Sequence, residues 1–150
     1  MQKKYFYSLI LLGILLDLGS KQFALQYFQE PWSIIGTFLQ FAYVENDGIA
    51  FSIDIPFLKI ATIILIIGIF VYYYKEERTK KNMYVDMAFA LVLAGAVGNG
   101  IERIFQNYVI DFIAVQGFSV FNIADSFITI GAIIYIVYLF LDKKMKKNIS

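Results

Sequence analysis

Two aspartates in the second half of the chain, Asp111 and Asp125, are a pair whose types and spacing could support catalysis. Asp111 lies in a short connection and Asp125 near the start of the apolar stretch that follows, so a turn of the chain can bring their carboxyl groups together. Two carboxyl groups at hydrogen-bonding distance share one proton, because ionising both is costly. One can then take a proton from water while the other donates to a carbonyl oxygen. The sequence assigns the shared proton to neither aspartate.

The residue types that are missing narrow the chemistry further. The chain contains no Cys and no His. Thiol nucleophiles, Ser-His dyads, histidine zinc sites, haem ligation by His and disulfides are therefore excluded. What remains is carboxylates, Lys, Tyr, Ser, Thr or a metal held by oxygen atoms alone, and paired carboxylates lead this group. We expect no cofactor and no metal.

Four apolar stretches must position these aspartates, at residues 5–27, 57–74, 83–105 and 121–141. Apolar residues make up 59% of the chain, more than an ordinary soluble domain carries. Each stretch approaches the roughly 20 residues that span a bilayer, and in lipid only a helix satisfies its own backbone groups. The sequence predicts an all-α integral membrane protein with four transmembrane helices, forming one domain over residues 1–150.

The connection at residues 28–56 predicts a small β-rich segment between the first two helices. Apolar residues alternate over 38–44, the run Asn46-Asp47-Gly48 is a turn signal, and residues 49–51 are consistent with a return strand. We expect a small sheet on the outer face of the membrane.

Basic residues set the orientation, because Lys and Arg beside spanning segments stay in the cytoplasm. They cluster before the first stretch, between the second and third, and after the fourth: Lys3, Lys4, Lys75, Arg78, Lys80, Lys81, Lys143, Lys144, Lys146 and Lys147. The other two connections contain no Lys or Arg, so both termini are expected inside. Topology explains these clusters, and no nucleic-acid partner is expected. A cleavable signal peptide over the first residues is the alternative, but it would leave only three spans.

Several polar residues of the apolar stretches fall at the depth of Asp111. They are Asp17, Lys21, Asn99, Glu102, Arg103, Asn122 and Asp125. Ionisable residues at such depth are costly unless they are paired or face a cavity. Asp17 and Lys21 share a helix face, and a structural ion pair is favoured for them over catalysis. Arg103 has the alternative role of an interfacial anchor, and Asn99 and Asn122 either orient the dyad or cap helix ends.

The third stretch carries small residues at helical spacing. Ala90, Ala94 and Gly98 stand four residues apart, with Gly95 and Gly100 beside them. Small residues at this spacing let helix backbones approach closely in membranes. We interpret the pattern as helix packing.

Five blocks of the sequence form an ordered set, at residues 17–21, 46–51, 98–103, 109–113 and 121–126. In this order they resemble the lipoprotein signal peptidases, also called signal peptidase II, and the resemblance covers nearly the whole chain. It implies an aspartyl peptidase of the bacterial cytoplasmic membrane, with its active site at the extracytoplasmic face. The implied substrate is a prolipoprotein carrying diacylglyceryl on the Cys after the cleavage point. Membrane lipid is a further expected partner, and we expect a monomer.

The resemblance also implies roles for individual residues. Asp111 and Asp125 match the catalytic pair. Positions that line or support the site are matched by Asn46, Gly48, Asn99, Arg103 and Asn122, and Asp17 and Lys21 match a pair thought to hold it. Glu102 departs from the family pattern, which has Asp there, and Leu18 stands where a polar residue is usual. We expect Glu102 to be a supporting carboxylate paired with Arg103 or Lys21.

A small transporter and a noncatalytic scaffold are the competing classes. A transport path needs polar groups through the bilayer, but the inner halves of the last three stretches are almost wholly apolar apart from Asp86. A scaffold explains the small residues of the third stretch but not two acids facing one outer connection. The peptidase interpretation is preferred.

The orientation can be tested with single cysteines. Cysteines introduced at Gln40 and Gln116 should react with an impermeant maleimide added to intact cells, whereas one at Thr79 should react only after lysis. The native chain contributes no background because it has no Cys. If Thr79→Cys were labelled in intact cells and Gln40→Cys were not, the orientation would be the opposite of the predicted one.

Overall fold

Four long helices form the body of the protein. The computed structural model describes residues 1–48 and 57–147, and in this range the helices are α1 (Lys3–Tyr27), α2 (Leu58–Tyr72), α3 (Met83–Gln106) and α4 (Ile123–Lys147). All four are apolar enough to cross a membrane and long enough to do so, α2 when it is taken with the helical residues that continue it to Lys80, as predicted. The largest difference is in α4, which begins at Ile123 rather than at 121 and continues to Lys147 rather than ending at 141. The chain is thus a multi-pass membrane protein.

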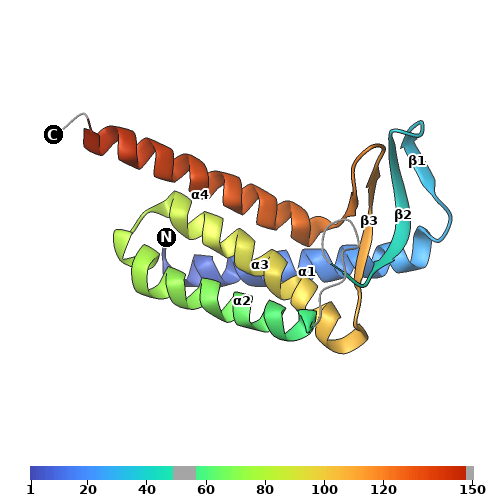
Figure 1. The fold of residues 1–150 in the computed structure, drawn as a ribbon, viewed down its shortest axis with the longest axis horizontal. Helices are drawn as coiled ribbons and strands as arrows, with labels where there is room; N and C mark the ends of the chain where they lie inside the picture. The colour runs from blue at the N-terminus through green and yellow to red at the C-terminus, as the bar shows by residue number, and fades with distance from the viewer. Residues whose placement is uncertain (49–56, 148–150) are drawn as a thin grey trace.

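The connection from α2 to α3 continues the helix in altered form. A π-helix, η2 (Tyr73–Glu77), and a short 3₁₀-helix, η3 (Arg78–Lys80), follow α2 directly. Asn82 then caps α3, because its side-chain oxygen accepts the backbone N–H groups of Tyr84 and Val85. This end of the helical body also holds both termini (Figure 1).

The sheet lies at the other end of the helices, and it draws on two connections rather than one (Figure 1). Strands β1 (Trp32–Ile35) and β2 (Leu39–Asn46) come from the connection between α1 and α2, as predicted. Strands β3 (Val109–Val115) and β4 (Val120–Phe121) come from the connection between α3 and α4, which the sequence analysis treated as a loop. The four strands are antiparallel in the order β1-β2-β3-β4. The predicted return strand at 49–51 lies outside the described residues.

Helix α3 is the centre of the bundle, since it packs against α1, α2 and α4. Glycines permit its closest contacts. A Cβ on Gly95 would lie 2.3 Å from the carbonyl oxygen of Ala124, and one on Gly98 would lie 2.5 Å from Oδ2 of Asp17. The interpretation of these small residues as packing positions is confirmed.

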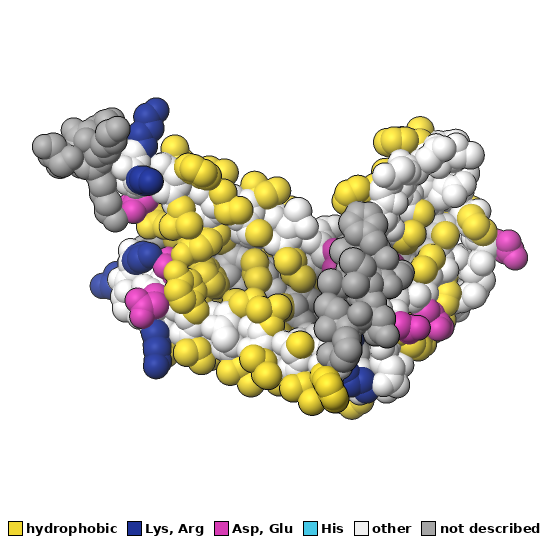
Figure 2. Space-filling model, in the orientation of Figure 1, with side chains coloured by type: hydrophobic (Ala, Val, Ile, Leu, Met, Phe, Trp, Pro, Cys, Tyr) yellow, Lys and Arg dark blue, Asp and Glu magenta, His cyan; other side chains and the backbone are white. Residues whose placement is uncertain are grey.

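The outer surface of the bundle matches a membrane environment. No residue of α2 is buried, although its sequence is strongly apolar. Hydrophobic side chains cover the helical body, and Lys and Arg gather mainly at the end that holds the termini (Figure 2). Contact with lipid favours this apolar surface, which the neighbouring helices leave uncovered.

Gly95→Ala should lower the free energy of unfolding by about 1–3 kcal/mol, because the added methyl overlaps the Ala124 carbonyl. Gly68→Ala is the matched control, since a Cβ on Gly68 of α2 meets nothing within 4 Å. The control should be neutral or stabilising by up to about 1 kcal/mol, as Ala favours a helix over Gly. Thermal unfolding in detergent measures both. Equal midpoints for the two variants would contradict the close approach of α3 and α4.

Candidate active site

Asp111 lies on β3, one of the two inner strands of the sheet, and is 2% exposed. Two amide groups hold its carboxyl: Nδ2 of Asn46 donates to Oδ2 at 2.8 Å, and Nδ2 of Asn122 donates to Oδ1 at 2.7 Å. The pKa of Asp111 is raised to about 6, chiefly by burial and also by the charge of Asp125, against the lowering effect of the two amide donors. The carboxyl of Asp111 therefore keeps its proton closer to neutral pH than an exposed aspartate does.

Asn46 reaches Asp111 from the end of the neighbouring strand β2. Its own position is fixed by a turn, because its Oδ1 accepts the backbone N–H of Gly48 at 3.1 Å. A turn was predicted at residues 46–48, and the structure gives it the form of an Asx turn. One asparagine therefore ends the strand and orients the carboxyl of Asp111.

Asp125 is held by the start of helix α4. Asn122 precedes the helix, and its Oδ1 accepts the backbone N–H of Asp125 at 2.9 Å, while Oδ2 of Asp125 accepts the backbone N–H of Asn122 at 3.2 Å. This reciprocal pair has the form of a capping box. Nδ2 of Asn99, on α3, donates to the other oxygen of Asp125 at 2.9 Å.

Asn122 joins the two carboxyl groups. Its amide donates to Asp111, and its backbone N–H and side-chain oxygen hold Asp125. The sequence left two roles open for Asn122, capping a helix end and orienting the two carboxyl groups, and Asn122 performs both. Asn99 lies inside α3, so it orients Asp125 and caps no helix end.

Behind the carboxyl groups lies a fully buried lysine, Lys21. Its Nζ lies 2.7 Å from Oδ2 of Asp17, 2.7 Å from Oδ1 of Asn99 and 2.8 Å from Oε2 of Glu102. The second oxygen of Asp17 accepts the backbone N–H of Ala124 at 2.8 Å, at the start of α4. The predicted Asp17–Lys21 pair is formed, and it connects α1 with α3 and α4.

Glu102 pairs with Lys21, which decides between the two cations that the sequence allowed. Its Oε2 also accepts the backbone N–H of Ile110 at 3.3 Å, and Ile110 directly precedes Asp111 on β3. The longer side chain thus links the buried lysine to the strand that carries Asp111. Nothing in the structure explains why Leu18 departs from the family pattern.

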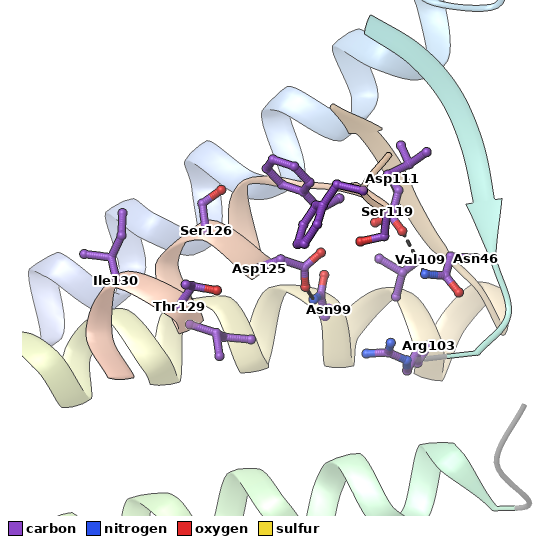
Figure 3. Close-up of a pocket in the computed structure, with 14 residues that line it drawn as sticks. Asn46, Asn99, Arg103, Val109, Asp111, Ser119, Asp125, Ser126, Thr129 and Ile130 are labelled. Carbon is purple, nitrogen blue, oxygen red and sulfur yellow. Dashed lines mark hydrogen bonds between the residues drawn. The ribbon is translucent and has the colours of Figure 1, made fainter. Parts of the chain in front are cut away.

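A cavity of about 530 Å³ opens beside the two aspartates (Figure 3). Arg103 lines it, donates from Nη2 to the carbonyl oxygen of Gly48 at 3.0 Å, and has a buried Nε without a partner among the described residues. Arg103 therefore faces the site and does not extend outward as an interfacial anchor. Asn46, Asn99, Asp111 and Asp125 also line the cavity.

The remaining residues that line the cavity were not predicted from the sequence. These residues are Val109, Phe118, Ser119, Val120, Phe121, Ser126, Ile128, Thr129 and Ile130. Helical periodicity points to part of this set, because Thr129 lies one turn beyond Asp125 on the same face of α4. The wall combines a polar end at the aspartates with a larger apolar part along α4 and the β3–β4 turn. It can hold a peptide bond at the carboxyl groups and an apolar group beside it.

Comparison with known proteins agrees with this geometry. Residues 9–141 match the sequence profile of the family described as Signal peptidase (SPase) II. The chain belongs to the signal peptidase II family. It is 36% identical to the lipoprotein signal peptidase of Chlorobium phaeobacteroides, with 96% of each chain covered. It is 33% identical to that of Listeria welshimeri, covering 97% of this chain and 99% of the relative.

The fold of this signal peptidase II family member also matches solved structures. One, described as a bacterial membrane enzyme at 2.3 Å resolution, aligns with a TM-score of 0.87 and 29% identity, covering 97% of this chain and 93% of the other. A second bacterial membrane enzyme, at 1.9 Å, aligns with a TM-score of 0.81 and 29% identity, covering 93% and 94%. The arrangement of four helices and a sheet is therefore shared across nearly the full length.

Lys21→Met should lower the free energy of unfolding by about 3–5 kcal/mol, because it leaves Asp17 and Glu102 buried without a cation. Lys143→Met is the control, because Lys143 is exposed near the end of α4 and its removal strands no buried acid among the described residues. This control should lose at most about 1 kcal/mol. Thermal midpoints in detergent compare the two.

Neutralising the acids should restore part of the lost stability. Asp17→Asn and Glu102→Gln added to Lys21→Met remove the stranded charges and should raise the midpoint above that of Lys21→Met alone. A triple variant less stable than Lys21→Met would show that the three charges are not coupled.

Proposed function

We propose that the protein is an aspartyl endopeptidase that removes the signal peptide from diacylglyceryl-modified prolipoproteins. The observation that carries the proposal is the position of Asp111 and Asp125, which share the hydrogen-bonding side chain and backbone of Asn122 at the wall of one cavity. Membership of the signal peptidase II family supports the reaction class, and relatives in that family are named lipoprotein signal peptidases.

The surroundings of the two aspartates favour one division of roles. Asp111, with its pKa raised to about 6, holds the shared proton at the start of the reaction and donates it to the scissile carbonyl oxygen. Asp125 takes a proton from water, whose oxygen attacks the carbonyl carbon to give a tetrahedral gem-diol. On collapse, Asp125 returns its proton to the leaving amine nitrogen, and a hydroxyl of the gem-diol returns one to Asp111. The reaction ends with both aspartates in their starting states.

Hydrogen bonds from neutral amides suit this cycle. Asn46, Asn99 and Asn122 donate to the carboxyl oxygens without adding a charge. A cation in direct contact would fix the carboxylate in its ionised form and oppose proton sharing. The side chain of Asn99 lies between the ammonium group of Lys21 and the carboxyl group of Asp125, because it is hydrogen-bonded to both.

The substrate assignment follows from the two parts of the cavity. Its polar end at the aspartates suits the peptide, and side chains such as Phe118, Ile128 and Ile130 suit the apolar, lipid-bearing part of a prolipoprotein. The sheet end is distant from most Lys and Arg, which supports an extracytoplasmic site and cytoplasmic termini (Figure 2). Membership of the signal peptidase II family supports a place in the bacterial cytoplasmic membrane.

Asp111→Asn and Asp125→Asn should each lower turnover by at least about a hundredfold, because Asn keeps the shape of Asp but neither shares a proton nor acts as a base. The measurement is cleavage of a lipid-modified precursor by purified protein in detergent or lipid. Asp47→Asn is the matched control, an exposed acid of the same outer region, and should keep normal turnover. Near-normal cleavage by either dyad variant, in protein that is folded and inserted, would exclude the dyad.

A further inference from the structure

A second cavity, of about 490 Å³, lies at the opposite end of the helices from the two aspartates. It is bounded by the start of α1 and by the connection from α2 to α3. Three cationic side chains line it: Lys3 at the start of α1, Arg78 in η3 and Lys81 directly after η3. We call it the basic cavity.

The local backbone brings two of these cations to one side. Arg78 begins η3 and Lys81 directly follows it, and both side chains line the basic cavity. Lys81 adopts the left-handed conformation, with φ at 49°, which ends η3 and turns the chain toward α3. The guanidinium of Arg78 lies over the ring of Tyr74, 4.7 Å from its centroid, and this contact limits its movement.

The cations of the basic cavity have unused hydrogen-bonding capacity. Within residues 1–48 and 57–147, no hydrogen bond or ion pair is formed by the side chains of Lys3, Arg78 or Lys81. Lys80, on the same turn, differs because it is engaged by buried Glu77. The basic cavity therefore presents several N–H donors that an anion with several oxygens can accept together.

One acid faces the basic cavity, and its oxygens are already engaged. Asp86 is 4% exposed, accepts the hydroxyl of Tyr73 at 2.8 Å through Oδ1, and contacts the amino group of Met1 through Oδ2. Three cationic side chains against one carboxylate leave the wall positive. The ring of Tyr73 stacks on Phe6 with centroids 4.5 Å apart, which gives the cavity a rigid aromatic floor.

We propose that the basic cavity binds the phosphate group of an anionic phospholipid. It lies where the spanning helices end, which is the depth of lipid phosphates in a bilayer. Basic pockets between spanning helices are suited to anionic headgroups, and each Lys or Arg near the membrane surface contributes about 1 kcal/mol to that attraction. Such a lipid would join the start of α1 to the turn before α3, two segments distant from the candidate active site.

The test compares two variants of the full chain with the same change in charge. Arg78→Gln with Lys81→Gln removes two cations of the basic cavity. Lys143→Gln with Lys144→Gln removes two exposed cations near the end of α4, at the same end of the protein but outside the cavity. Each protein is placed in nanodiscs of equal phosphatidylglycerol and phosphatidylcholine, and native mass spectrometry counts the lipids retained after release.

The unmodified protein and the α4 variant should retain phosphatidylglycerol in preference to phosphatidylcholine. The cavity variant should lose that preference by about tenfold or more. An equal loss in both variants, or no preference in the unmodified protein, would overturn the proposal, because general attraction between the basic end and anionic lipid would then suffice. If the double variant fails to fold, Lys81→Gln alone replaces it in the test, because Lys81 is exposed. This single variant should lose part of the preference for phosphatidylglycerol.

A second arm separates lipid from free phosphate. The delipidated protein is heated with added phosphatidylglycerol or with inorganic phosphate, against chloride at equal ionic strength. Phosphatidylglycerol should raise the thermal midpoint of the unmodified protein and of the α4 variant, but not that of the cavity variant. An equal rise of the thermal midpoint with inorganic phosphate would overturn the proposal that a lipid occupies the basic cavity.

Discussion

The burial of one ammonium group, that of Lys21, is the constraint on which the rest of the site depends. A charge without exposure to water needs acceptors for all its protons, and Asp17, Asn99 and Glu102 supply three within 2.8 Å. Each acceptor has a second contact: Asp17 with the start of α4, Asn99 with Asp125, and Glu102 with the strand before Asp111. The position of the lysine therefore fixes the elements that carry both aspartates.

The start of α4 explains why several carboxyl groups gather there. The first turn of a helix has backbone N–H groups without partners and the positive end of the helix dipole, and both favour negative charge. Asp17 and Asp125 accept hydrogen bonds from this turn, and Asn122 completes the cap. The interactions that begin the helix thus also place Asp125 beside Asp111, so stability and site geometry have a common origin.

The two ends of the molecule have opposite polar chemistry on a shared apolar body. The sheet end gathers carboxyl and amide groups around one cavity, and Lys and Arg line a second cavity at the other end. Figure 2 shows most of the visible Lys and Arg at that other end. The spanning helices keep these ends apart by the thickness of a bilayer. A membrane protein can therefore combine a site with a raised carboxyl pKa and a site for anions without the charges of one neutralising the other.

The sequence by itself determined the four spans, because a helix forms its hydrogen bonds locally and lipid enforces the choice wherever about 20 apolar residues occur together. It also determined the turn at Asn46 and the proximity of Asp17 to Lys21, which are local too. Tertiary structure decided that Asp111 lies on a strand, since β3 pairs with β2 from a distant connection. It likewise decided that Glu102 binds Lys21 rather than neighbouring Arg103, and which apolar side chains wall the cavity. These contacts join segments far apart in the chain, and local patterns carry no information on which distant partners meet.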